Sequence, residues 1–215
     1  MQKIGKLHVL TDTRLQSRFS HVQLTEMAIA GGADTIQFRH KQGSTREMID
    51  VATQMKQVCA RQGVTFIVND RIDIAIAAQA DGVHLGLDDF PIPLARELLG
   101  HDRMIGGSAA TVEEARKCLA DGADYVGFGP VFPTDSKNDA GPASGIEVLR
   151  KTVTTIPLPI IAIGGIDEGN ASAVMGAGAH GIAVISAICC RKDPLQATEG
   201  LCQALHPEVT GAQHA

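Results

Sequence analysis

The stretch that decides the fold is Asp124–Lys137, which reads Asp-Tyr-Val-Gly-Phe-Gly-Pro-Val-Phe-Pro-Thr-Asp-Ser-Lys. Its first half is apolar and contains glycine, a pattern typical of a buried strand. Its second half is broken by two prolines and therefore predicts a loop. That loop presents Thr134, Ser136 and Lys137, and two hydroxyls beside a cation suit the oxygens of a phosphate group. Taken alone, the same residues also fit an ordinary polar loop.

Strand-like and helix-like segments alternate on both sides of this stretch. Short β-prone runs are expected at residues 7–10, 34–38, 65–68, 82–85, 104–107, 125–128, 159–163 and 181–184. Helical patterns are expected at residues 24–30, 45–61, 72–78, 91–99, from 111 onward, near 146–153, near 170–175 and at 194–205. Thr111 and Glu114 have the spacing of a capping box.

Eight strands that each precede a helix predict right-handed βαβ units and a parallel sheet. The pattern favours a single-domain TIM (β/α)₈ barrel over residues 1–215, and an open doubly wound sheet is the alternative. The polar tail after about residue 207 is expected to fray.

Composition excludes several classes of function. The chain has 215 residues, 44% hydrophobic and 20% charged, with a net charge of -5, so no basic field for nucleic acid is expected. The start of the chain lacks a signal-peptide pattern, and no apolar run approaches the roughly 20 residues of a membrane span. The five cysteines show no Cys-x-x-Cys spacing and are expected to be reduced thiols, mostly on buried helix faces. These features predict a cytoplasmic location without a membrane partner.

Polar side chains follow the second predicted strand. Side chains alternate between the two faces of a strand, so Gln37, Arg39 and, if the strand persists, Lys41 share one face, opposite Ile36 and Phe38. The apolar pair is expected beneath the helices and the polar set inside the barrel mouth. A buried arginine needs either an anionic ligand or an internal carboxylate, and the sequence leaves both open.

Two aspartates follow the third and fourth strands. Asp70 and Asp89 are expected at neighbouring strand ends, close enough to share one divalent cation. Carboxylate oxygens favour Mg²⁺, which completes its shell with water and substrate phosphate. Each aspartate, like Asp88, alternatively fits a helix cap. The pair beside an arginine and a lysine favours a metal–phosphate site.

The last two strands end in residues suited to phosphate. Gly164 and Gly165 allow close backbone approach after the seventh strand, and Ile185-Ser186 follows the eighth. Loops at these positions commonly bind phosphate in this fold. Two phosphate-binding regions on opposite sides of the mouth suit two phosphorylated substrates or one elongated substrate.

Several motifs resemble those of the thiamine phosphate synthase family, in the same order and over nearly the whole chain. They are Gln37-Phe38-Arg39-His40-Lys41, Asn69-Asp70-Arg71, Gly82-Val-His-Leu-Gly86 with Asp89, Gly129-Pro-Val-Phe-Pro-Thr-Asp-Ser-Lys137, Ile163-Gly-Gly-Ile166 and Ile185-Ser186.

The resemblance implies a residue set for each substrate. The residues implied to bind the pyrimidine diphosphate are Gln37, Phe38, Arg39, His40, Lys41, Asn69, Ser108 and Lys137. Those implied to bind the thiazole phosphate are Thr134, Asp135, Ser136, Gly165, Ile185 and Ser186. Asp70 and Asp89 are implied to bind Mg²⁺. The sequence does not determine the oligomeric state and leaves a homodimer open.

The family reaction, by this resemblance, joins the thiazole nitrogen to the pyrimidine methylene carbon with loss of pyrophosphate through a pyrimidine carbocation. Arg39, Lys41 and Lys137 are the implied catalytic residues, because cations stabilise negative charge on the leaving pyrophosphate. No side chain needs to act as a covalent nucleophile. The loop from Pro130 to Gly145 is expected to close over substrate.

Three positions depart from the family pattern. Leu87 replaces a usual glutamine, Ala110 a common histidine, and Ser136 a usual threonine that keeps its hydroxyl. The first two keep open a noncatalytic barrel that binds phosphorylated ligands. A thiazole tautomerase is the nearest enzymatic alternative, but that relative has histidine where this chain has Pro130. A sugar-phosphate isomerase would need an acid–base pair, and His40 and His84 are expected to be packing or hydrogen-bonding residues instead.

Overall fold

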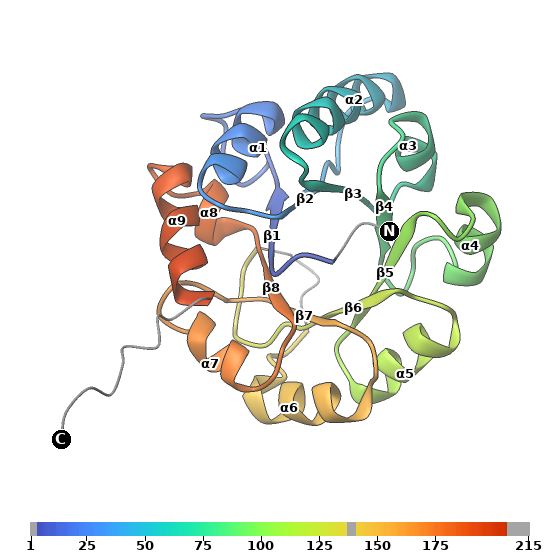
Figure 1. Cartoon of the computed structure of the whole chain (residues 1–215), viewed down its shortest axis with the longest axis vertical. Coiled ribbons are helices and arrows are strands. Elements are labelled where there is room, and N and C mark those ends of the chain that lie inside the picture. The colour runs from blue at the N-terminus through green and yellow to red at the C-terminus, as the bar shows by residue number, and fades with distance from the viewer. Residues whose placement is uncertain (1–3, 137–140, 206–215) are drawn as a thin grey trace.

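Eight parallel strands close on one another in sequence order (Figure 1). The computed structural model describes residues 4–136 and 141–205. The strands are β1 (Leu7–Thr11), β2 (Thr35–Phe38), β3 (Thr65–Asn69), β4 (Gly82–Leu85), β5 (Met104–Ala109), β6 (Tyr125–Phe128), β7 (Ile160–Ile163) and β8 (Gly181–Val184). Pairing of Leu7 with Ile182 and of Val9 with Val184 closes the ring between β1 and β8. The predicted (β/α)₈ barrel is confirmed, and the open sheet is excluded.

Helices surround this ring (Figure 1). They are α1 (His21–Ala30), α2 (Thr45–Gln62), α3 (Ile72–Ala77), α4 (Ile92–Leu99), α5 (Val112–Ala120), α6 (Gly145–Thr155), α7 (Ala171–Gly176), α8 (Ser186–Cys189) and α9 (Pro194–Leu205). The capping box predicted at Thr111 and Glu114 is confirmed. A second box, between Ser20 and Gln23, starts α1 three residues earlier than expected. The four-residue helix α8 was not predicted, because so short a segment has no readable period.

Strand β5 is two residues longer than predicted, and the reason lies in its neighbour. Ser108 and Ala109 pair with Gly127 and Phe128 of β6, so the ladder continues past Gly107. This extension places Ser108 on a strand rather than in a loop.

The core lies between the strands and the helices. Ile36 and Phe38 of β2 are buried there, as their alternation predicted, together with Phe66 and Val68 of β3. A smaller apolar cluster fills the barrel interior, formed by Leu10, Tyr125, Ile161, Ala183 and Ile185. Burial of this surface is the main favourable contribution to folding.

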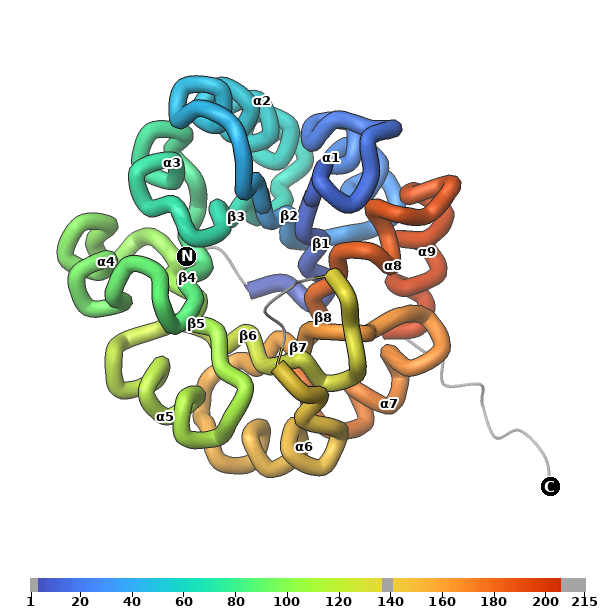
Figure 2. Tube along the Cα trace, turned by 180° about the vertical axis from the view of Figure 1, so that it is seen from behind, coloured from blue at the N-terminus to red at the C-terminus, as the bar shows by residue number. Residues whose placement is uncertain are grey.

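The two ends of the barrel differ in what covers them. Figure 1 shows the segment before β1 crossing one end, where Ile4 packs against the interior cluster. The opposite view in Figure 2 shows the loop after β6 beside β8 and α8 at the other end, where the strands terminate. Ligands of this fold bind at the carboxyl ends of the strands.

The described cysteines are all free, as predicted, and Cys59, Cys118 and Cys189 are buried on helices. Across residues 4–136 and 141–205, no helix is long and apolar enough to cross a membrane. The tail expected to fray lies outside the described residues.

Candidate active site

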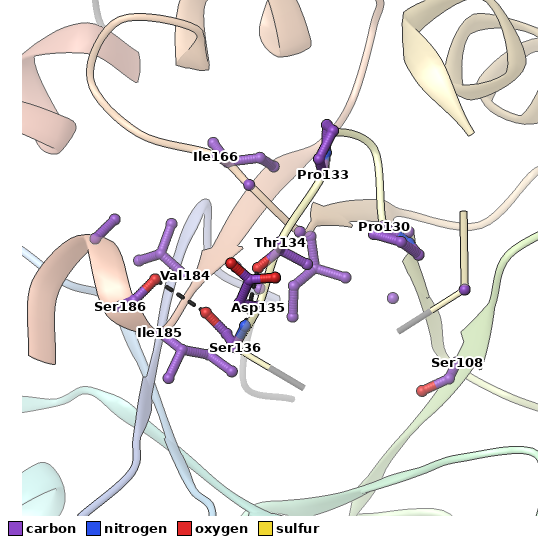
Figure 3. Close-up of a pocket in the computed structure, with 18 of the residues that line it drawn as sticks. Ser108, Pro130, Pro133, Thr134, Asp135, Ser136, Ile166, Val184, Ile185 and Ser186 are labelled. Atoms are coloured by element: carbon purple, nitrogen blue, oxygen red, sulfur yellow. Dashed lines mark hydrogen bonds between the residues drawn. The ribbon is translucent and has the colours of Figure 1, made fainter. Parts of the chain in front are cut away.

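A cavity of about 900 Å³ opens at the carboxyl ends of β4 to β8 (Figure 3). Its lining includes seven residues that the sequence assigned to substrate, namely Ser108, Thr134, Asp135, Ser136, Gly165, Ile185 and Ser186. Ser108 lies across the cavity from Ser136 and Ser186 in Figure 3. The structure therefore brings the predicted thiazole phosphate residues together around one open space.

We call Ser136, Gly165, Ile185 and Ser186 the glycine side of the mouth. The hydroxyls of Ser136 and Ser186 hydrogen-bond each other at 2.9 Å (Figure 3). Gly165 has a φ of 64°, a left-handed conformation that favours glycine. A Cβ atom at Gly165 would lie 2.5 Å from the carbonyl oxygen of Pro133. Only glycine therefore fits this close approach of the two loops.

The loop after β6 is anchored at both described ends. The backbone N–H of Val131 donates to Ile163 O at 2.9 Å, and that of Ser144 donates to Pro130 O at 2.8 Å. Lys137 lies outside the described residues. Closure of the Pro130–Gly145 loop over substrate stays a prediction.

We call Arg39, Lys41, Asp70 and Asp89 the carboxylate side of the mouth. The N–H of Arg39 donates to Thr11 O, so the β1–β2 pairing continues one residue past Phe38 and turns Arg39 inward. Arg39 forms a buried ion pair with Asp12. The sequence left open whether an anionic ligand or an internal carboxylate balances the charge of Arg39. The structure shows an internal carboxylate, that of Asp12. The Arg39 Nε atom is buried and has no hydrogen-bond partner among the described residues.

Lys41 forms an ion pair with Asp70, although the strand ends before Lys41. Asp70 itself has a φ of 64°, in the left-handed region that aspartate occupies more readily than most residues. Its backbone N–H donates to His84 O at 2.8 Å, which links the ends of β3 and β4. This linkage brings Asp70 next to Asp89.

The two carboxyl groups influence each other's pKa values. Burial alone would raise the pKa of Asp70, but hydrogen bonds from Asp89 and Lys41 outweigh it and hold that pKa below its ordinary value. Burial, with the hydrogen bond to Asp70, raises the pKa of Asp89. The two groups therefore titrate as a pair, in which Asp70 loses its proton at lower pH than Asp89.

Neither aspartate caps a helix with its side chain, so the capping interpretation is wrong. The residue before α3 is Arg71 and the residue before α4 is Pro91, and neither start has a side-chain cap. Asp89 instead accepts the N–H of Gly86 at 2.7 Å and closes its own loop.

The donor set on the carboxylate side fits Mg²⁺. Among the described residues, no group of three or more histidine, cysteine, aspartate or glutamate side chains is arranged to hold a metal ion. Mg²⁺ needs only one or two carboxylates, however, because water and substrate phosphate complete its shell. Asp70 and Asp89 supply that number, and the ammonium group of Lys41 already occupies part of the position a cation would take.

The four residues of the carboxylate side lie outside the cavity lining, and so do four further residues that the sequence assigned to substrate. Gln37 and Asn69 are buried at the ends of β2 and β3. Phe38 packs beneath the helices, so its side chain faces away from the mouth. His40 Nδ1 lies 2.9 Å from His21 Nε2 and is a hydrogen-bonding residue, as expected.

Asp12 was missed by the sequence reasoning. It is 1% exposed and is the partner of Arg39, and it also accepts the N–H of Arg14 at 2.8 Å. The sequence did offer one indication, because Asp12 directly follows the first strand just as Asp70 directly follows the third. Cys190 and Arg191 also line the cavity, next to α8, and no motif marked them.

All three departures from the family pattern line the cavity, and Ser136 has been described with the glycine side. Leu87 is 59% exposed and Ala110 is half-buried, and both line the cavity. Neither contributes a polar side chain there, as the sequence predicted.

Comparisons with known proteins agree with these motifs. The family model described as thiamine monophosphate synthase matches residues 7–188. The thiamine-phosphate synthase of Salinibacter ruber is 48% identical over 197 residues, which cover 92% of this chain and 87% of that protein. The enzyme of the same name from Methanocella arvoryzae is 48% identical over 195 residues, covering 91% and 92%. The solved structure of thiamine phosphate pyrophosphorylase from Pyrococcus furiosus superposes with a TM-score of 0.85 at 42% identity, covering 93% and 95%.

Proposed function

This chain belongs to the thiamine monophosphate synthase family, a family of transferases in thiamine biosynthesis, and we propose that its barrel mouth divides the two substrates between its two sides. The carboxylate side binds the pyrimidine diphosphate together with Mg²⁺. The glycine side binds the thiazole phosphate. In this arrangement the reacting atoms of the two bound substrates face each other in the cavity.

The carboxylate side suits a diphosphate because its cations are already turned inward. Arg39 is held by Asp12, and its Nε–H, which has no partner among residues 4–136 and 141–205, can donate to a phosphate oxygen. Lys41 can move from Asp70 to the diphosphate when the carboxylates accept a metal. Mg²⁺ bound by Asp70 and Asp89 would supply Lewis-acid stabilisation of the leaving pyrophosphate.

The glycine side suits a phosphate monoester. Ser136 and Ser186 bond each other at 2.9 Å, and a phosphate oxygen placed between them would accept from both hydroxyls. The backbone at Gly165 can approach that phosphate closely because it carries no side chain. We assign Thr134, Asp135 and Ile185 to the same ligand because they line the same cavity.

The reaction forms one bond and breaks one. The thiazole nitrogen lone pair forms a bond to the pyrimidine methylene carbon, and the electron pair of the carbon–oxygen bond leaves with pyrophosphate. Arg39, Lys41 and Lys137 act as cations that stabilise the leaving group. The remaining contribution of the protein is to hold the two substrates in line. No covalent intermediate on the protein is required.

One observation carries this proposal. A carboxyl pair with two cations lies at the ends of β2 to β4, beside a cavity that is lined by the hydroxyl–glycine pair, so that two phosphorylated ligands can be held next to each other. A sugar-phosphate isomerase would use one phosphate position and an acid–base pair instead.

The test is pyrophosphate release by the purified protein given pyrimidine diphosphate, thiazole phosphate and Mg²⁺. Release is expected to require both substrates, to stop with EDTA, and to fall at least about 100-fold in Asp70→Ala, because metal binding supplies several kcal/mol. Asp73→Ala is the matched control, since Asp73 is an exposed neighbour whose ion pair is with Arg71, a residue not assigned to either substrate or to the metal. That variant is expected to retain its rate.

Other outcomes would favour the alternatives. Binding of phosphate esters without pyrophosphate release would favour a noncatalytic barrel. Isomerisation of the thiazole ring with one substrate alone would favour a tautomerase. Release that is unaffected by both EDTA and Asp70→Ala would overturn the metal site.

We further infer that the protein works in the cytoplasm on small molecules, which its reduced cysteines and net charge of -5 support. A homodimer stays a prediction, and sedimentation velocity would test it.

A further inference from the structure

The segment that begins with α8 turns one face toward the cavity. Four of its residues line the cavity, namely Ser186, Ala187, Cys190 and Arg191, and Ser186 is seen at its edge in Figure 3. Ile188 and Cys189, which lie between them, are buried. Positions i, i+1, i+4 and i+5 share one face of a helix with 3.6 residues per turn. The N–H of Arg191 donates to Ile188 O at 3.0 Å, so the turn continues as far as Arg191. Arg191 therefore lies on the same face as Ser186, just over one turn further along the chain.

Arg191 is held in place through its backbone. Its carbonyl oxygen accepts a hydrogen bond from Arg18 Nη2 at 2.6 Å, and the carbonyl oxygen of Cys190 accepts from the same nitrogen at 3.2 Å. The Cys190 thiol donates to Leu15 O at 3.7 Å, which adds a second link to the loop after β1. The residue itself is exposed, and within residues 4–136 and 141–205 no ion pair involves Arg191. Its guanidinium group therefore carries a charge that no described carboxylate balances by direct contact.

The charges around the cavity make this cation important. The described residues of the lining include three carboxylates and one cation, namely Asp88, Asp135, Asp167 and Arg191. A phosphate monoester carries about 1.5 to 2 negative charges near pH 7, and carboxylates at the same cavity repel it. The hydroxyls of Ser136 and Ser186 and the backbone at Gly165 offer hydrogen bonds but no net charge. On the glycine side, the charge that attracts a phosphate must therefore come from another group.

We propose that Arg191 is a further substrate-binding residue, whose guanidinium group binds the phosphate of the thiazole substrate beside Ser186. A guanidinium group suits this role because its planar fork donates two parallel N–H bonds to phosphate oxygens. Binding breaks no ion pair of Arg191, in contrast to Lys41, which must leave Asp70. The position of Arg191 on the Ser186 face rests on the structure alone, whereas the identity of the ligand rests on the proposed function.

The first test measures binding without catalysis. Calorimetry of the full-length protein compares thiamine phosphate, the product of the proposed reaction, with thiamine, which lacks the phosphate. Arg191→Gln is expected to weaken binding of thiamine phosphate about tenfold, the scale of one charge-assisted hydrogen bond. Binding of thiamine is expected to change less than about twofold on the same scale. An equal loss for both compounds would overturn the proposal, because Arg191 would then not act on the phosphate.

The second test measures KM for each substrate by pyrophosphate release. Arg191→Gln is expected to raise KM for the thiazole phosphate about tenfold and to change KM for the pyrimidine diphosphate less than about twofold. Arg191→Lys keeps the charge but loses the planar fork, and it should stay within about threefold of the parent. The effect of Arg191→Gln is expected to shrink as salt is added, because ions screen charges at exposed positions.

Lys192→Gln is the matched control, because it removes the same charge from the next residue, which is exposed and lies outside the cavity lining. It should leave both KM values and the binding of thiamine phosphate unchanged. An equal effect of the two variants would reflect the general field of the protein and would overturn the proposal.

The failure of this inference differs from that of the proposed function. If the protein releases pyrophosphate from both substrates but Arg191→Gln changes neither the binding of thiamine phosphate nor KM for the thiazole phosphate, only the role of Arg191 is overturned. A rise in KM for the pyrimidine diphosphate alone would overturn it as well. A parent protein that neither releases pyrophosphate nor binds thiamine phosphate would overturn both.

Discussion

The two sides of the barrel mouth satisfy their polar groups in different ways. On the carboxylate side, Arg39 is paired with Asp12 and Lys41 with Asp70. On the glycine side, the polar groups are backbone atoms and two serine hydroxyls that border the open cavity. A ligand on the carboxylate side must therefore replace contacts that already exist, whereas a ligand on the glycine side meets groups that border open space.

This difference predicts different kinds of sensitivity to mutation. Charges buried together are expensive to separate, since each needs the other in a low-dielectric interior. Hydroxyls and glycines contribute less to the free energy of folding, but they set the shape of a binding surface. Variants on the carboxylate side are thus expected to change stability, and those on the glycine side to change KM.

The largest expected effect comes from separating the buried ion pair. Asp12→Asn leaves the buried guanidinium of Arg39 without its counter-charge and is expected to cost roughly 3–5 kcal/mol of unfolding free energy in urea titrations. Lys117→Gln is the control, because it breaks an exposed pair with Asp121 on α5. That pair is expected to contribute about 0.3–0.5 kcal/mol. Equal losses of unfolding free energy in the two variants would show that the buried pair on the carboxylate side contributes no more stability than an exposed pair.

The free energy of unfolding is expected to fall at acid pH because of His21, whose ring contacts His40 next to the carboxylate side. Burial lowers the pKa of His21 to about 4, with His40 adding to the effect and Asp12 opposing it. The unfolded chain protonates this residue near pH 6.5, so the stability that it contributes is complete above that pH and is lost as the pH falls toward 4. The loss is about 1.4 kcal/mol per pH unit within that window.

The variant His21→Gln should remove this part of the pH dependence. Urea titrations between pH 4 and pH 6.5 are expected to give a shallower fall in unfolding free energy than the parent, in the window set by the two pKa values. His101→Gln, an exposed change at the opposite end of the barrel, is the control and should retain the parent slope. If the dependence of unfolding free energy on pH were unchanged in His21→Gln, the His21 ring would be protonated equally in the folded and unfolded states.

The two sides also differ in how many of their contacts could be predicted from the sequence. The alternation of Ile36, Gln37, Phe38 and Arg39 was enough to predict which side chains face inward. The partner of Arg39 was not predictable in this way. Asp12 lies 27 positions earlier and meets Arg39 only because β1 and β2 pair with Thr11 opposite Phe38.

Other features depend on three-dimensional detail that no pattern carries. The left-handed backbone at Asp70 and its hydrogen bond to the β4 end bring it beside Asp89, and neither is visible in the residue order. The glycine side was more predictable, since Gly165 and Ser186 follow strands in a fold whose phosphate positions are general. What the sequence omitted there was the direct bond between Ser136 and Ser186.

On the glycine side, Gly165→Ala tests whether shape matters more than stability. A Cβ atom would lie 2.5 Å from Pro133 O and 2.7 Å from Phe132 Cβ, at a φ of 64°. We expect KM for the thiazole phosphate to rise about tenfold, with a stability loss of roughly 1–3 kcal/mol from backbone strain. Gly176→Ala is the control, since a Cβ there meets nothing within 4 Å. A rise in KM for the pyrimidine diphosphate instead would place that substrate on the glycine side.

The smallest expected effect is that of Ser136. Ser136→Ala removes one hydroxyl from the pair with Ser186 and is expected to raise KM for the thiazole phosphate about threefold, the scale of one neutral hydrogen bond. Ser136→Thr keeps the hydroxyl and should stay within about twofold of the parent on the same scale. Neither change should alter unfolding free energy, because this bond is exposed to solvent, where water replaces the lost partner. A stability loss as large as that of Asp12→Asn would mean that the glycine side, too, is held together by its own contacts.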